Sequence, residues 1–598
     1  MPLRSLTVDL ARGHARQLLP DEVERDYLGG RGAIAWLLWH QLEPDTPPLS
    51  AENLLIFAAG PLAGSVGFAT GGFTVGTRSP LTGGIGYGWA PGHWGAALRR
   101  NNVDVLIIRG EAPDWCYLLI DGDTVRLRSA RHLVGRDTVA TAVTLSTELG
   151  GNVRVLAVGP AGEAGVAYAS IVAEGLYLVE PAGTGAVMAD KKLKAIVVRD
   201  RAPLPVVDLA RMQAVLQSIR QRGEQHPTAN AIRAIGSAGL LPAAIKLGAL
   251  TSRDARAPAD GVAIARTFSE IARRGGRLER GCAECPLPCY IDLRTKSGET
   301  HPLPSLELIA GFAARVGITD PDAMLAIADR CLRLGIDPAA AAAAIVFMTE
   351  AQDEGLVRQR TLNWGDSAAV IAALDRISQR QEKRDILSLG VGEMQEAVWG
   401  TAAFAPQVKG LAMPALDPRA LTEIGLAMAT SPIGGDYRYA MAFEELVAEP
   451  PAWLPPPASG PRESEGKALR LIWHERFAAV LDASGFCRRL GLMAYQITPG
   501  ELIALIGAVT GRAVTGADLV RIGERIVTLD RLFTRRYASN SQDTLPDRYL
   551  REPLSSGPTA GYTPPLDSLL AEYYARHGWD VSGDPTPARL SELGIKQR

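Results

Sequence analysis

A short run of cysteines is the feature that most constrains this chain. Three of its six cysteines, Cys282, Cys285 and Cys289, form a C-x2-C-x3-C pattern. Thiolates this close together can converge on one metal centre, and the prolines between Cys285 and Cys289 limit helix formation. Iron–sulfur clusters and structural zinc sites usually have four ligands, so a fourth ligand must come from elsewhere in the chain. The run therefore predicts an iron–sulfur or a zinc centre.

Cys487 is the best candidate for the fourth ligand. It follows Gly485, which allows a close backbone approach, and Asp482, which can cap a helix or bind a polar ligand. Cys116 opens an apolar run and Cys331 lies in a helical pattern, and both are typical of buried structural cysteines. The alternatives are a disulfide with a spare thiol, or three unrelated core cysteines; a disulfide is disfavoured because the chain shows no secretory signal.

Composition limits the classes of protein and partner. The 598 residues are enough for three or four domains, and 47% hydrophobic residues can fill several cores. Lys+Arg 63 against Asp+Glu 65, with no block of like charge, predicts no nucleic-acid or anionic membrane partner. No apolar run reaches the roughly 18 residues of a membrane span, and the N-terminus resembles a strand rather than a signal peptide. We therefore expect a cytoplasmic protein without a membrane span.

The pattern of hydrophobic residues changes near residue 204. Before it, short alternating or apolar segments are separated by glycine turns, with helices expected after 29–32 and over 138–149. After it, apolar residues recur at helical spacing and strands become rare. The pattern predicts a β-rich half and a mainly helical half. The expected strands are 5–10, 53–59, 72–77, 103–109, 116–121, 153–158 and 193–198, and the proline-rich segment 449–457 is an expected surface excursion.

Two glycine-rich segments, 70–84 and 181–191, have the composition of loops that cradle phosphate with backbone amides. Neither matches the Walker or the dinucleotide-binding fingerprint in context, so each alone favours a structural role.

Together with the cysteines, these segments closely resemble the tungsten-dependent aldehyde ferredoxin oxidoreductase family over almost the full chain. The resemblance implies an α+β fold with a β-rich pterin-binding domain at 1–203 and mainly helical domains at 204–405 and 406–598. It also implies a [4Fe-4S] cluster, which favours iron over zinc at Cys282, Cys285, Cys289 and Cys487. The segments that carry it, in the family's order, are 28–32, 79–83, 159–163, 185–188, the cysteine run, 409–411, 417–419, 482–487 and 573–579.

The resemblance further implies a bis-pterin cofactor that holds tungsten or molybdenum. The family's D-x-x-G-L-C motif is met by 482–487, so that Asp482, Gly485 and Phe486, which replaces leucine, are expected at a pterin. A related D-x-x-G-L-D motif ends at Asp337, but its first carboxylate is replaced by Leu332.

This chain matches the family's phosphate-binding loops, but with different residues at three positions. Gly72 and Pro181 stand where arginines are common, and Trp89 stands where an asparagine is common. Such residues would hold the pterin phosphates directly or through Mg²⁺, so their replacement removes donors and charge. The adjoining segment Gly183, Thr184 and Gly185 is expected to contact the same cofactor.

The resemblance assigns two catalytic positions. Glu307 matches a carboxylate near the metal and is expected to act as general base. Alternatively, Glu307 has a structural role, as an acidic residue that the dipole at a helix N-terminus stabilises. Tyr437 stands where the family's active-site histidine is expected, and would serve as a hydrogen-bond donor.

Two functions follow from the resemblance. The first is interconversion of a small-molecule aldehyde and its carboxylic acid at tungstopterin, with electrons passed through the cluster to ferredoxin or an iron–sulfur subunit, in a chain expected to form homodimers. The alternative is a divergent paralogue without tungstopterin, serving as an iron–sulfur electron-transfer or scaffold subunit of a larger complex. The alternative is motivated by uneven replacement, because the four cysteine positions are present while several pterin and proton-transfer positions are changed.

Overall fold

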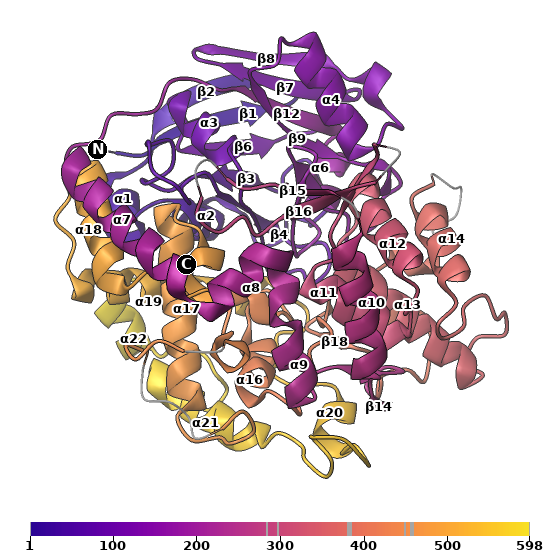
Figure 1. Ribbon diagram of the computed structural model, residues 1–598. Helices are drawn as coiled ribbons and strands as arrows, with labels where there is room; N and C mark the ends of the chain where they lie inside the picture. Colours follow the sequence, from indigo (N-terminus) through magenta and orange to yellow (C-terminus); the bar gives the residue numbers. More distant parts are fainter. Residues whose placement is uncertain are drawn as a thin grey trace.

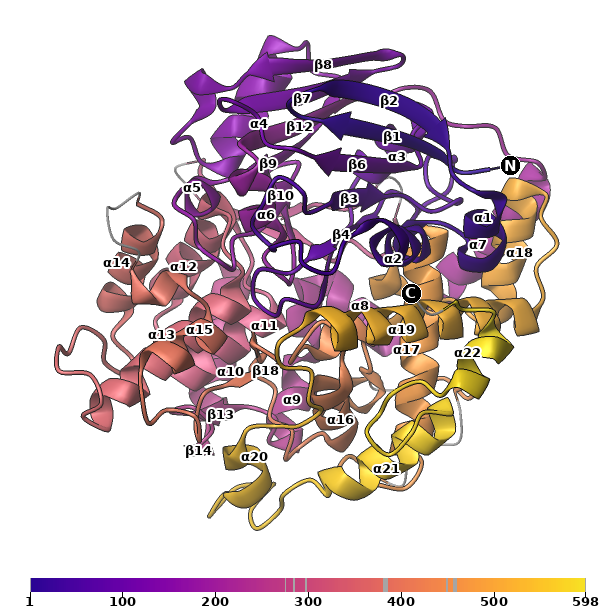
Figure 2. The same cartoon turned by 180° about the vertical axis from the view of Figure 1, so that it is seen from behind.

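A computed structural model describes residues 2–274, 276–282, 285–295, 298–379, 385–447, 450–454 and 460–596. The strand-rich N-terminal part, coloured indigo to purple, lies against the helices formed by the rest of the chain (Figures 1 and 2). The expected α+β class, with a β-rich N-terminal region followed by a mainly helical one, is therefore confirmed.

Two six-stranded mixed sheets form the N-terminal region. The first has the order β2-β1-β6-β3-β4-β5, and the second has the order β11-β10-β9-β12-β7-β8. Alternate residues of both sheets meet in one apolar core that also includes Trp94 of helix α3. The strands are β1 (Arg4–Asp9), β2 (Gly13–Leu18), β3 (Leu55–Ala58), β4 (Phe73–Arg78), β5 (Ile85–Ala90), β6 (Val105–Arg109), β7 (Cys116–Asp121), β8 (Thr124–Ser129), β9 (Val153–Val158), β10 (Ile171–Ala173), β11 (Tyr177–Val179) and β12 (Leu193–Arg199).

The helices of this region lie around the sheets. Helix α2 packs on β3 and β4, and α4 covers the outer face of the second sheet with a small core of its own. Helix α2 begins at Gly30, within the glycine-rich segment rather than after it, so that Arg31 belongs to its first turn. The bounds are α1 (Asp21–Tyr27), α2 (Gly30–Gln41), α3 (Trp94–Arg100), α4 (Thr138–Glu148), α5 (Pro160–Glu163) and α6 (Thr184–Asp190).

All seven expected strands are present, but the sequence did not reveal five others in the two sheets, β2, β5, β8, β10 and β11. Every residue of β2 is exposed and β8 is largely so, so neither has a buried face to give an alternating pattern. Strand β5 contains two glycines, which are depleted in strands. Strands β10 and β11 have three residues each, too few to show a period.

The C-terminal part is mainly helical, as expected, with one consequential exception. The cysteine run lies between two strands of a small sheet, β15 (Gly276–Glu279), β16 (Ile291–Arg294) and β17 (Thr300–Pro302). This hairpin places the run beside the N-terminal region. Two further pairs are β13 (Thr251–Ser252) with β14 (Ala257–Pro258), and β18 (Gln407–Val408) with β19 (Leu411–Ala412).

Two helices of this part deliver site residues from opposite ends. Alanine, the best helix former, lets α13 pack closely, and almost the whole helix is buried. Helix α17 ends at Gly485, whose left-handed backbone terminates the helix and redirects the chain toward Cys487. The bounds are α7 (Leu209–Gln225), α8 (Pro227–Ile235), α9 (Leu241–Leu247), α10 (Gly261–Arg273), α11 (Leu306–Leu308), α12 (Pro321–Leu334), α13 (Pro338–Asp353), α14 (Ser367–Ile377), α15 (Val391–Ala397), α16 (Thr422–Thr430), α17 (Lys467–Ser484), α18 (Pro499–Thr510), α19 (Gly516–Tyr537), α20 (Asp547–Arg551), α21 (Leu566–His577) and α22 (Pro587–Leu593).

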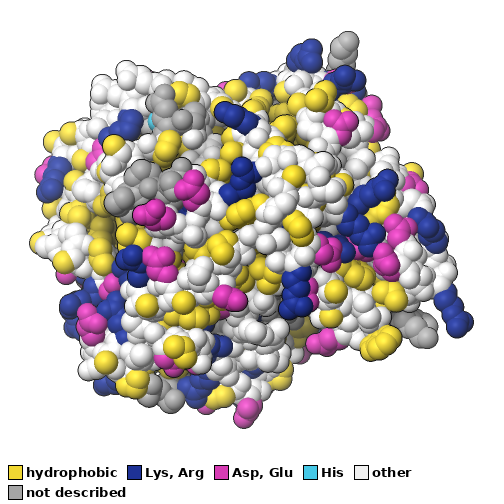
Figure 3. Space-filling model, turned by 90° about the horizontal axis from the view of Figure 1, so that it is seen from below, with side chains coloured by type: hydrophobic (Ala, Val, Ile, Leu, Met, Phe, Trp, Pro, Cys, Tyr) yellow, Lys and Arg dark blue, Asp and Glu magenta, His cyan; other side chains and the backbone are white. Residues whose placement is uncertain are grey.

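On the face seen from below, acidic and basic side chains are interspersed, so that neither sign of charge dominates this surface (Figure 3). Within the described residues, no helix combines the length and apolarity needed to cross a bilayer. Of the proline-rich segment 449–457, only residues 450–454 belong to the described part of the chain.

Candidate functional site

The four predicted metal-ligating cysteines converge. Cys282, Cys285 and Cys289 from the β15–β16 connection and Cys487 from the end of α17 line one small cavity. The thiols lie so close together that negative charge on Cys289 and Cys487 helps to raise the pKa of both Cys282 and Cys285. Cysteines that lie far apart in the sequence therefore form one set of four thiol donors, the kind of set that binds a [4Fe-4S] cluster.

Backbone amides point at these sulfurs. The N–H of Gly92 donates to the Cys282 Sγ at 3.2 Å, and the N–H groups of Arg489 and Leu490 donate to the Cys487 thiol. Burial first, and the neighbouring Cys289 second, raise the pKa of Cys487 to about 12. Without a metal this thiol stays protonated, whereas a bound metal would deprotonate it and the amides would stabilise the thiolate.

The other two cysteines lie elsewhere and are buried. Cys116 opens β7, where burial raises its pKa to about 11, and Cys331 lies inside α12. Neither lines the four-thiol cavity, so their placement agrees with a packing role, although Cys331 also lines a neighbouring pocket.

The D-x-x-G-x-C segment joins the thiols to a buried ionic network. Gly485 adopts φ 80°, and a Cβ there would lie 2.9 Å from the backbone nitrogen of Gly60, so the close approach requires glycine. Phe486 is buried. The Asp482 carboxylate faces two arginines, with its Oδ2 at 3.6 Å from Arg31 Nη1 and 3.4 Å from Arg488 Nη1.

Arg31 is a site residue that sequence reasoning missed. Its guanidinium is 1% exposed, donates to the Asp530 carboxylate at 2.9 Å, and lies 4.0 Å from the ring centroid of Tyr439. Tyr87 and Tyr439 also donate to Asp530. The only signal was an arginine among glycines at 29–32, and nothing local indicates that Tyr439, Asp482 and Asp530, some 400 to 500 positions away, are its partners.

The first glycine-rich loop is closed by an aromatic ring. Trp89 on β5 is 7% exposed, and its ring lies 5.3 Å from the guanidinium carbon of Arg488. A Cβ at Gly72 would lie 3.2 Å from the Trp89 ring and 3.1 Å from the Ala90 carbonyl oxygen. A side chain at position 72 would therefore press against the Trp89 ring, which would have to shift to admit it.

The second glycine-rich loop packs against backbone. A Cβ at Gly183 would lie 2.4 Å from the Ala167 carbonyl oxygen, and one at Gly185 would lie 2.6 Å from the Ser170 carbonyl carbon. Both glycines thus have a close-packing reason to be glycine. Thr184 between them is buried, and its hydroxyl has no hydrogen-bond partner among the described residues.

Asp337 is also engaged within the protein. Its carboxylate caps α13 by accepting from the N–H groups of Ala339 and Ala340, at 2.8 and 3.2 Å. Its other oxygen lies 3.8 Å from Arg438 Nη2, and Arg438 also pairs with Asp436 at 2.7 Å and with Glu180 at 2.6 Å. This is a second buried arginine–carboxylate network.

An enclosed pocket lies beside the four thiols. Its cavity volume is about 100 Å³. Apolar side chains line it together with Cys289, with three arginines and with three carboxylates: Arg280, Arg438, Arg489, Glu180, Asp292 and Glu307. Glu307 sits on α11, directly before the π-helical segment η3 (Ile309–Val316), and Tyr437 begins the 3-10 turn η5 (Tyr437–Tyr439). Burial first, and the adjacent Glu307 carboxylate second, raise the pKa of Tyr437 well above its usual value. The structure therefore brings the two predicted catalytic residues together.

The donor sets fit the two expected cofactors unequally. Four thiols on one cavity, served by backbone N–H groups, fit an iron–sulfur cluster. The residues expected to hold a bis-pterin do not fit it as well. Trp89 lies against Gly72, and Asp337 is paired with Arg438. Asp482 is only partly satisfied: its Oδ2 faces Arg31 and Arg488, whereas its Oδ1 and the Nε of Arg31 have no hydrogen-bond partner among the described residues. The phosphate ends of a pterin would find an aromatic ring in place of cationic donors.

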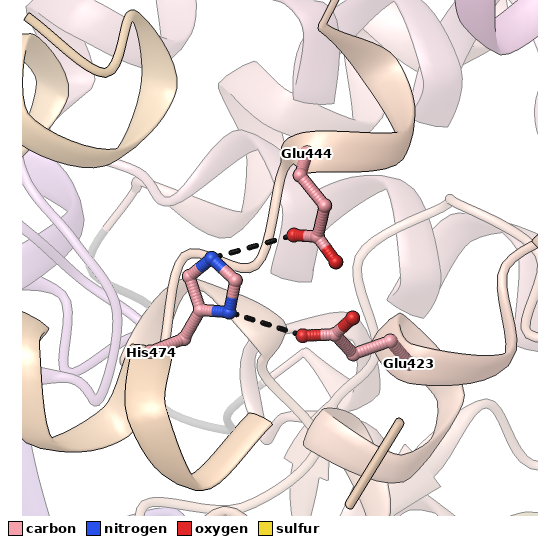
Figure 4. Close-up of side chains that lie close together, drawn as sticks. All are labelled: Glu423, Glu444 and His474. Carbon is pink, nitrogen blue, oxygen red and sulfur yellow. Dashed lines mark ion pairs between the residues drawn. The ribbon is translucent and has the colours of Figure 1, made fainter. Parts of the chain in front are cut away.

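A third buried cluster lies apart from the cysteines (Figure 4). His474 Nδ1 is 3.1 Å from Glu423 Oε1, and His474 Nε2 is 3.3 Å from Glu444 Oε2. The hydrogen bonds of the ring go elsewhere, from Nδ1 to the Arg470 carbonyl oxygen at 3.0 Å and between Nε2 and the Tyr495 hydroxyl at 3.0 Å, which suits a hydrogen-bonded imidazole better than a metal ligand. Lys467 and Arg470 supply positive charge beside the same carboxylates.

Comparison with known proteins defines the class. The N-terminal domain of aldehyde ferredoxin oxidoreductase matches residues 5–200, and domains 2 and 3 of that enzyme match residues 214–595. The chain belongs to the aldehyde ferredoxin oxidoreductase family, a family of oxidoreductases.

Individual relatives cover nearly the whole chain. The tungsten-containing aldehyde ferredoxin oxidoreductase of Pyrococcus furiosus is 29% identical, with 99% of each chain covered. The aliphatic sulfonate oxidoreductase WOR-like subunit of the same organism is 25% identical over 99% of this chain and 96% of its own. Among solved structures, the active-site complex BamBC of benzoyl coenzyme A reductase with 1,5-dienoyl-CoA superposes with a TM-score of 0.82 at 24% identity, covering 99% of this chain and 96% of its own, which shows the shared fold.

Proposed function

We propose that this chain is an iron–sulfur redox protein whose [4Fe-4S] cluster is held by Cys282, Cys285, Cys289 and Cys487. The observation that carries the proposal is the convergence of these four thiols on one cavity, with backbone N–H groups aimed at two of them. When bound, such a cluster supplies one-electron transfer at a potential set by nearby charge and hydrogen bonds.

The pocket beside the cluster is the place where a small molecule would bind. Glu307, which lines the pocket, would accept a proton there. The hydroxyl of Tyr437 lies beside Glu307, and it would donate a hydrogen bond because its raised pKa keeps it protonated. Apolar lining residues such as Leu176 and Leu303 would exclude water from the bound molecule.

We further propose that the chain acts without tungstopterin, as an electron-transfer subunit of a larger assembly. The ring of Trp89 beside Gly72 and the pairing of Asp337 with Arg438 support this choice. The relative named as the WOR-like subunit of a sulfonate oxidoreductase is a precedent for a subunit role. The electron partner would be ferredoxin or an iron–sulfur subunit.

A second function is favoured by the juxtaposition of Glu307 and Tyr437, which a pure electron carrier does not need. It is the conversion of an aldehyde and water into a carboxylic acid, two protons and two electrons, or its reverse. It requires a tungsten or molybdenum bis-pterin, with Mg²⁺ at the phosphates, and is supported by tungsten-containing relatives over the whole chain.

Metal analysis of the anaerobically purified protein separates the two functions. We expect about four irons per chain, neither tungsten nor molybdenum, and no pterin fluorescence after acid oxidation. Stoichiometric tungsten or molybdenum together with pterin would select the aldehyde reaction. Absence of iron from protein purified and reconstituted under reducing conditions would contradict both.

A further inference from the structure

The hydrogen bond to Cys282 differs from those to Cys487 in the origin of its donor. The N–H groups that donate to Cys487 belong to Arg489 and Leu490, in the same turn of the chain. The donor to Cys282 is the N–H of Gly92, at 3.2 Å, from a loop 190 positions earlier. Gly92 and Cys282 also line a hollow of about 390 Å³, which has room for water that would compete for the sulfur. The bond to Cys282 therefore depends on the contacts that hold the Gly92 loop.

The carboxylate of Glu174 binds this loop. Its Oε1 accepts from the N–H groups of His93 at 2.6 Å and Trp94 at 3.0 Å, the two residues that follow Gly92. Its Oε2 lies 3.2 Å from His93 Nδ1 and 3.6 Å from Arg154 Nη1. The His93 side chain does not cap α3, so a carboxylate from another element satisfies N–H groups at the start of this helix. Glu174 thus fixes the peptide groups next to the donor.

The backbone of Glu174 is strained. The residue lies in the turn between β10 and β11 with a φ of 57°, in the left-handed region that residues other than glycine rarely adopt. Asparagine, aspartate and glycine are the residues that accept this conformation most readily. The side chain of Glu174 is only 10% exposed, so it is held by the protein rather than by solvent. Strain of this kind persists where the surrounding contacts require the residue, which directs attention to what the carboxylate holds.

The same hairpin also holds the segment that carries the acceptor. The Tyr177 hydroxyl, on β11, donates to the carbonyl oxygen of Arg280 at 3.3 Å, two positions before Cys282. A Cβ at Gly92 would lie 2.7 Å from Glu174 Oε1 and 2.9 Å from the Tyr177 ring, so both side chains pack against this glycine. The β10–β11 hairpin therefore binds the donor loop through Glu174 and the acceptor segment through Tyr177.

From this arrangement we infer that Glu174 is a positioning residue for the cluster: it holds the Gly92 N–H toward Cys282 and thereby raises the reduction potential of the cluster. The inference rests on the proposed cluster and deepens that function. An N–H bond to a ligating sulfur stabilises the reduced cluster more than the oxidised one, because reduction places more negative charge on the sulfurs. The negative charge of Glu174 itself acts in the opposite direction, so its charge and its acceptor oxygens must be separated by experiment.

Two neutral substitutions separate these effects. Glu174→Gln keeps an oxygen that accepts from the two N–H groups, whereas Glu174→Met has a similar length and no comparable acceptor. The reduction potential of each purified holoprotein is measured by EPR-monitored titration. We expect the equilibrium constant for reduction to be about threefold to tenfold lower in Glu174→Met than in Glu174→Gln; a tenfold difference equals about 59 mV for a one-electron couple. Equal potentials in the two variants would overturn the inference, because the charge alone would then account for any change from the wild type.

Hydrogen–deuterium exchange, measured by mass spectrometry on the protein as purified, reports on the loop directly. The peptide that contains residues 92–94 should exchange about tenfold faster in Glu174→Met than in the wild type, and at the wild-type rate in Glu174→Gln. Unchanged exchange in Glu174→Met would overturn the positioning role. If Glu174→Met does not fold, Glu174→Asp replaces it, because aspartate keeps the charge, suits the left-handed turn and withdraws the acceptor by one methylene group. We expect faster exchange and a lower potential in Glu174→Asp, and wild-type values there would overturn the inference.

Asp137 provides a matched control, because it also accepts from an N–H group at the start of a helix, that of Ala140 on α4 at 2.7 Å, but does not line the four-thiol cavity. Asp137→Ala should speed exchange at the start of α4 and leave the reduction potential at its wild-type value. A shift as large as that of Glu174→Met would overturn the inference, since any lost helix cap would then alter the potential. An absence of iron would instead contradict the proposed function, while exchange in residues 92–94 still judges whether Glu174 holds the loop.

Discussion

The cysteine half and the carboxylate half of the site differ in how far their charged groups are paired within the protein. Around Cys282, Cys285, Cys289 and Cys487, donors point at thiols that need a metal to become thiolates. Around Asp482 and Asp337, every carboxylate already faces an arginine of the same chain. The first half offers donors to a charged group, whereas in the second half one oxygen of each carboxylate already faces an internal cation.

The largest expected effect tests the first half. Cys487→Ser removes the one ligand supplied from outside the run, so we expect loss of the cluster's visible absorbance and of most of the bound iron. Cys116→Ser, at a buried cysteine away from the cavity, should keep about four irons per chain. Unchanged iron in Cys487→Ser would show that the fourth ligand is another residue.

The next prediction tests whether the second half is self-supporting. Arg31→Met leaves Asp530 buried without its cation and Asp482 with Arg488 alone, so we expect a loss of about 3–5 kcal/mol in the free energy of unfolding. The comparison is made by urea denaturation. Arg25→Met, at an exposed arginine, should change stability by less than about 0.5 kcal/mol. A small effect at Arg31 would mean that this network is not needed for folding.

A double-mutant cycle probes the space between Trp89 and Gly72. We expect Gly72→Arg to cost about 1–3 kcal/mol by overpacking and Trp89→Asn to cost about 3–5 kcal/mol by leaving a cavity. Because the arginine can enter the space vacated by the ring, the double variant should lose less than the sum of the two. Trp399→Asn, at a ring that is 92% exposed, serves as the neutral control. If the two losses of stability were strictly additive, the arginine at position 72 would not be occupying the space that the Trp89 ring vacates.

The smallest effect is a pH dependence at Glu180. Burial first, and the nearby Asp337 second, raise its pKa to about 8 from 4.5. The folded state therefore binds one more proton than the unfolded state between these values, and the contribution of Glu180 to stability falls as pH rises through that window. The slope is at most about 1.4 kcal/mol per pH unit. Glu180→Gln, which mimics the protonated form, should lose less stability than the wild type between pH 5 and pH 8 in urea titrations.

Much of the fold could be predicted because its signals are local. Strands β7 and β9 were placed to the residue by their apolar runs, and the change to helical spacing located the second half. The exposed β2 and the glycine-containing β5 could not be found in this way, because their pairing partners rather than their own patterns define them. The small sheet around the cysteine run was missed for the same reason.

The residues of the candidate site also divide into those with a local sequence signal and those that only their surroundings identify. The cysteine run, Asp482 and Glu307 were identified from motifs, and the structure brings Cys487 to the run and Tyr437 to Glu307. Arg31, Arg438 and Arg489 were not identified, because arginines are common and only their surroundings distinguish them. Whether the expected pterin residues bind a pterin stays a prediction.

The sequence by itself determined the donor chemistry of this protein, since spacing and residue type fix which atoms can bind a metal. Only the tertiary structure decided which charges are already satisfied. Electrostatic pairing acts over a few ångströms of space and ignores distance along the chain, as in the contact between Arg31 and Asp530. The tertiary structure therefore revealed what the motif left open, that one oxygen of each of Asp482 and Asp337 faces an arginine of the same chain.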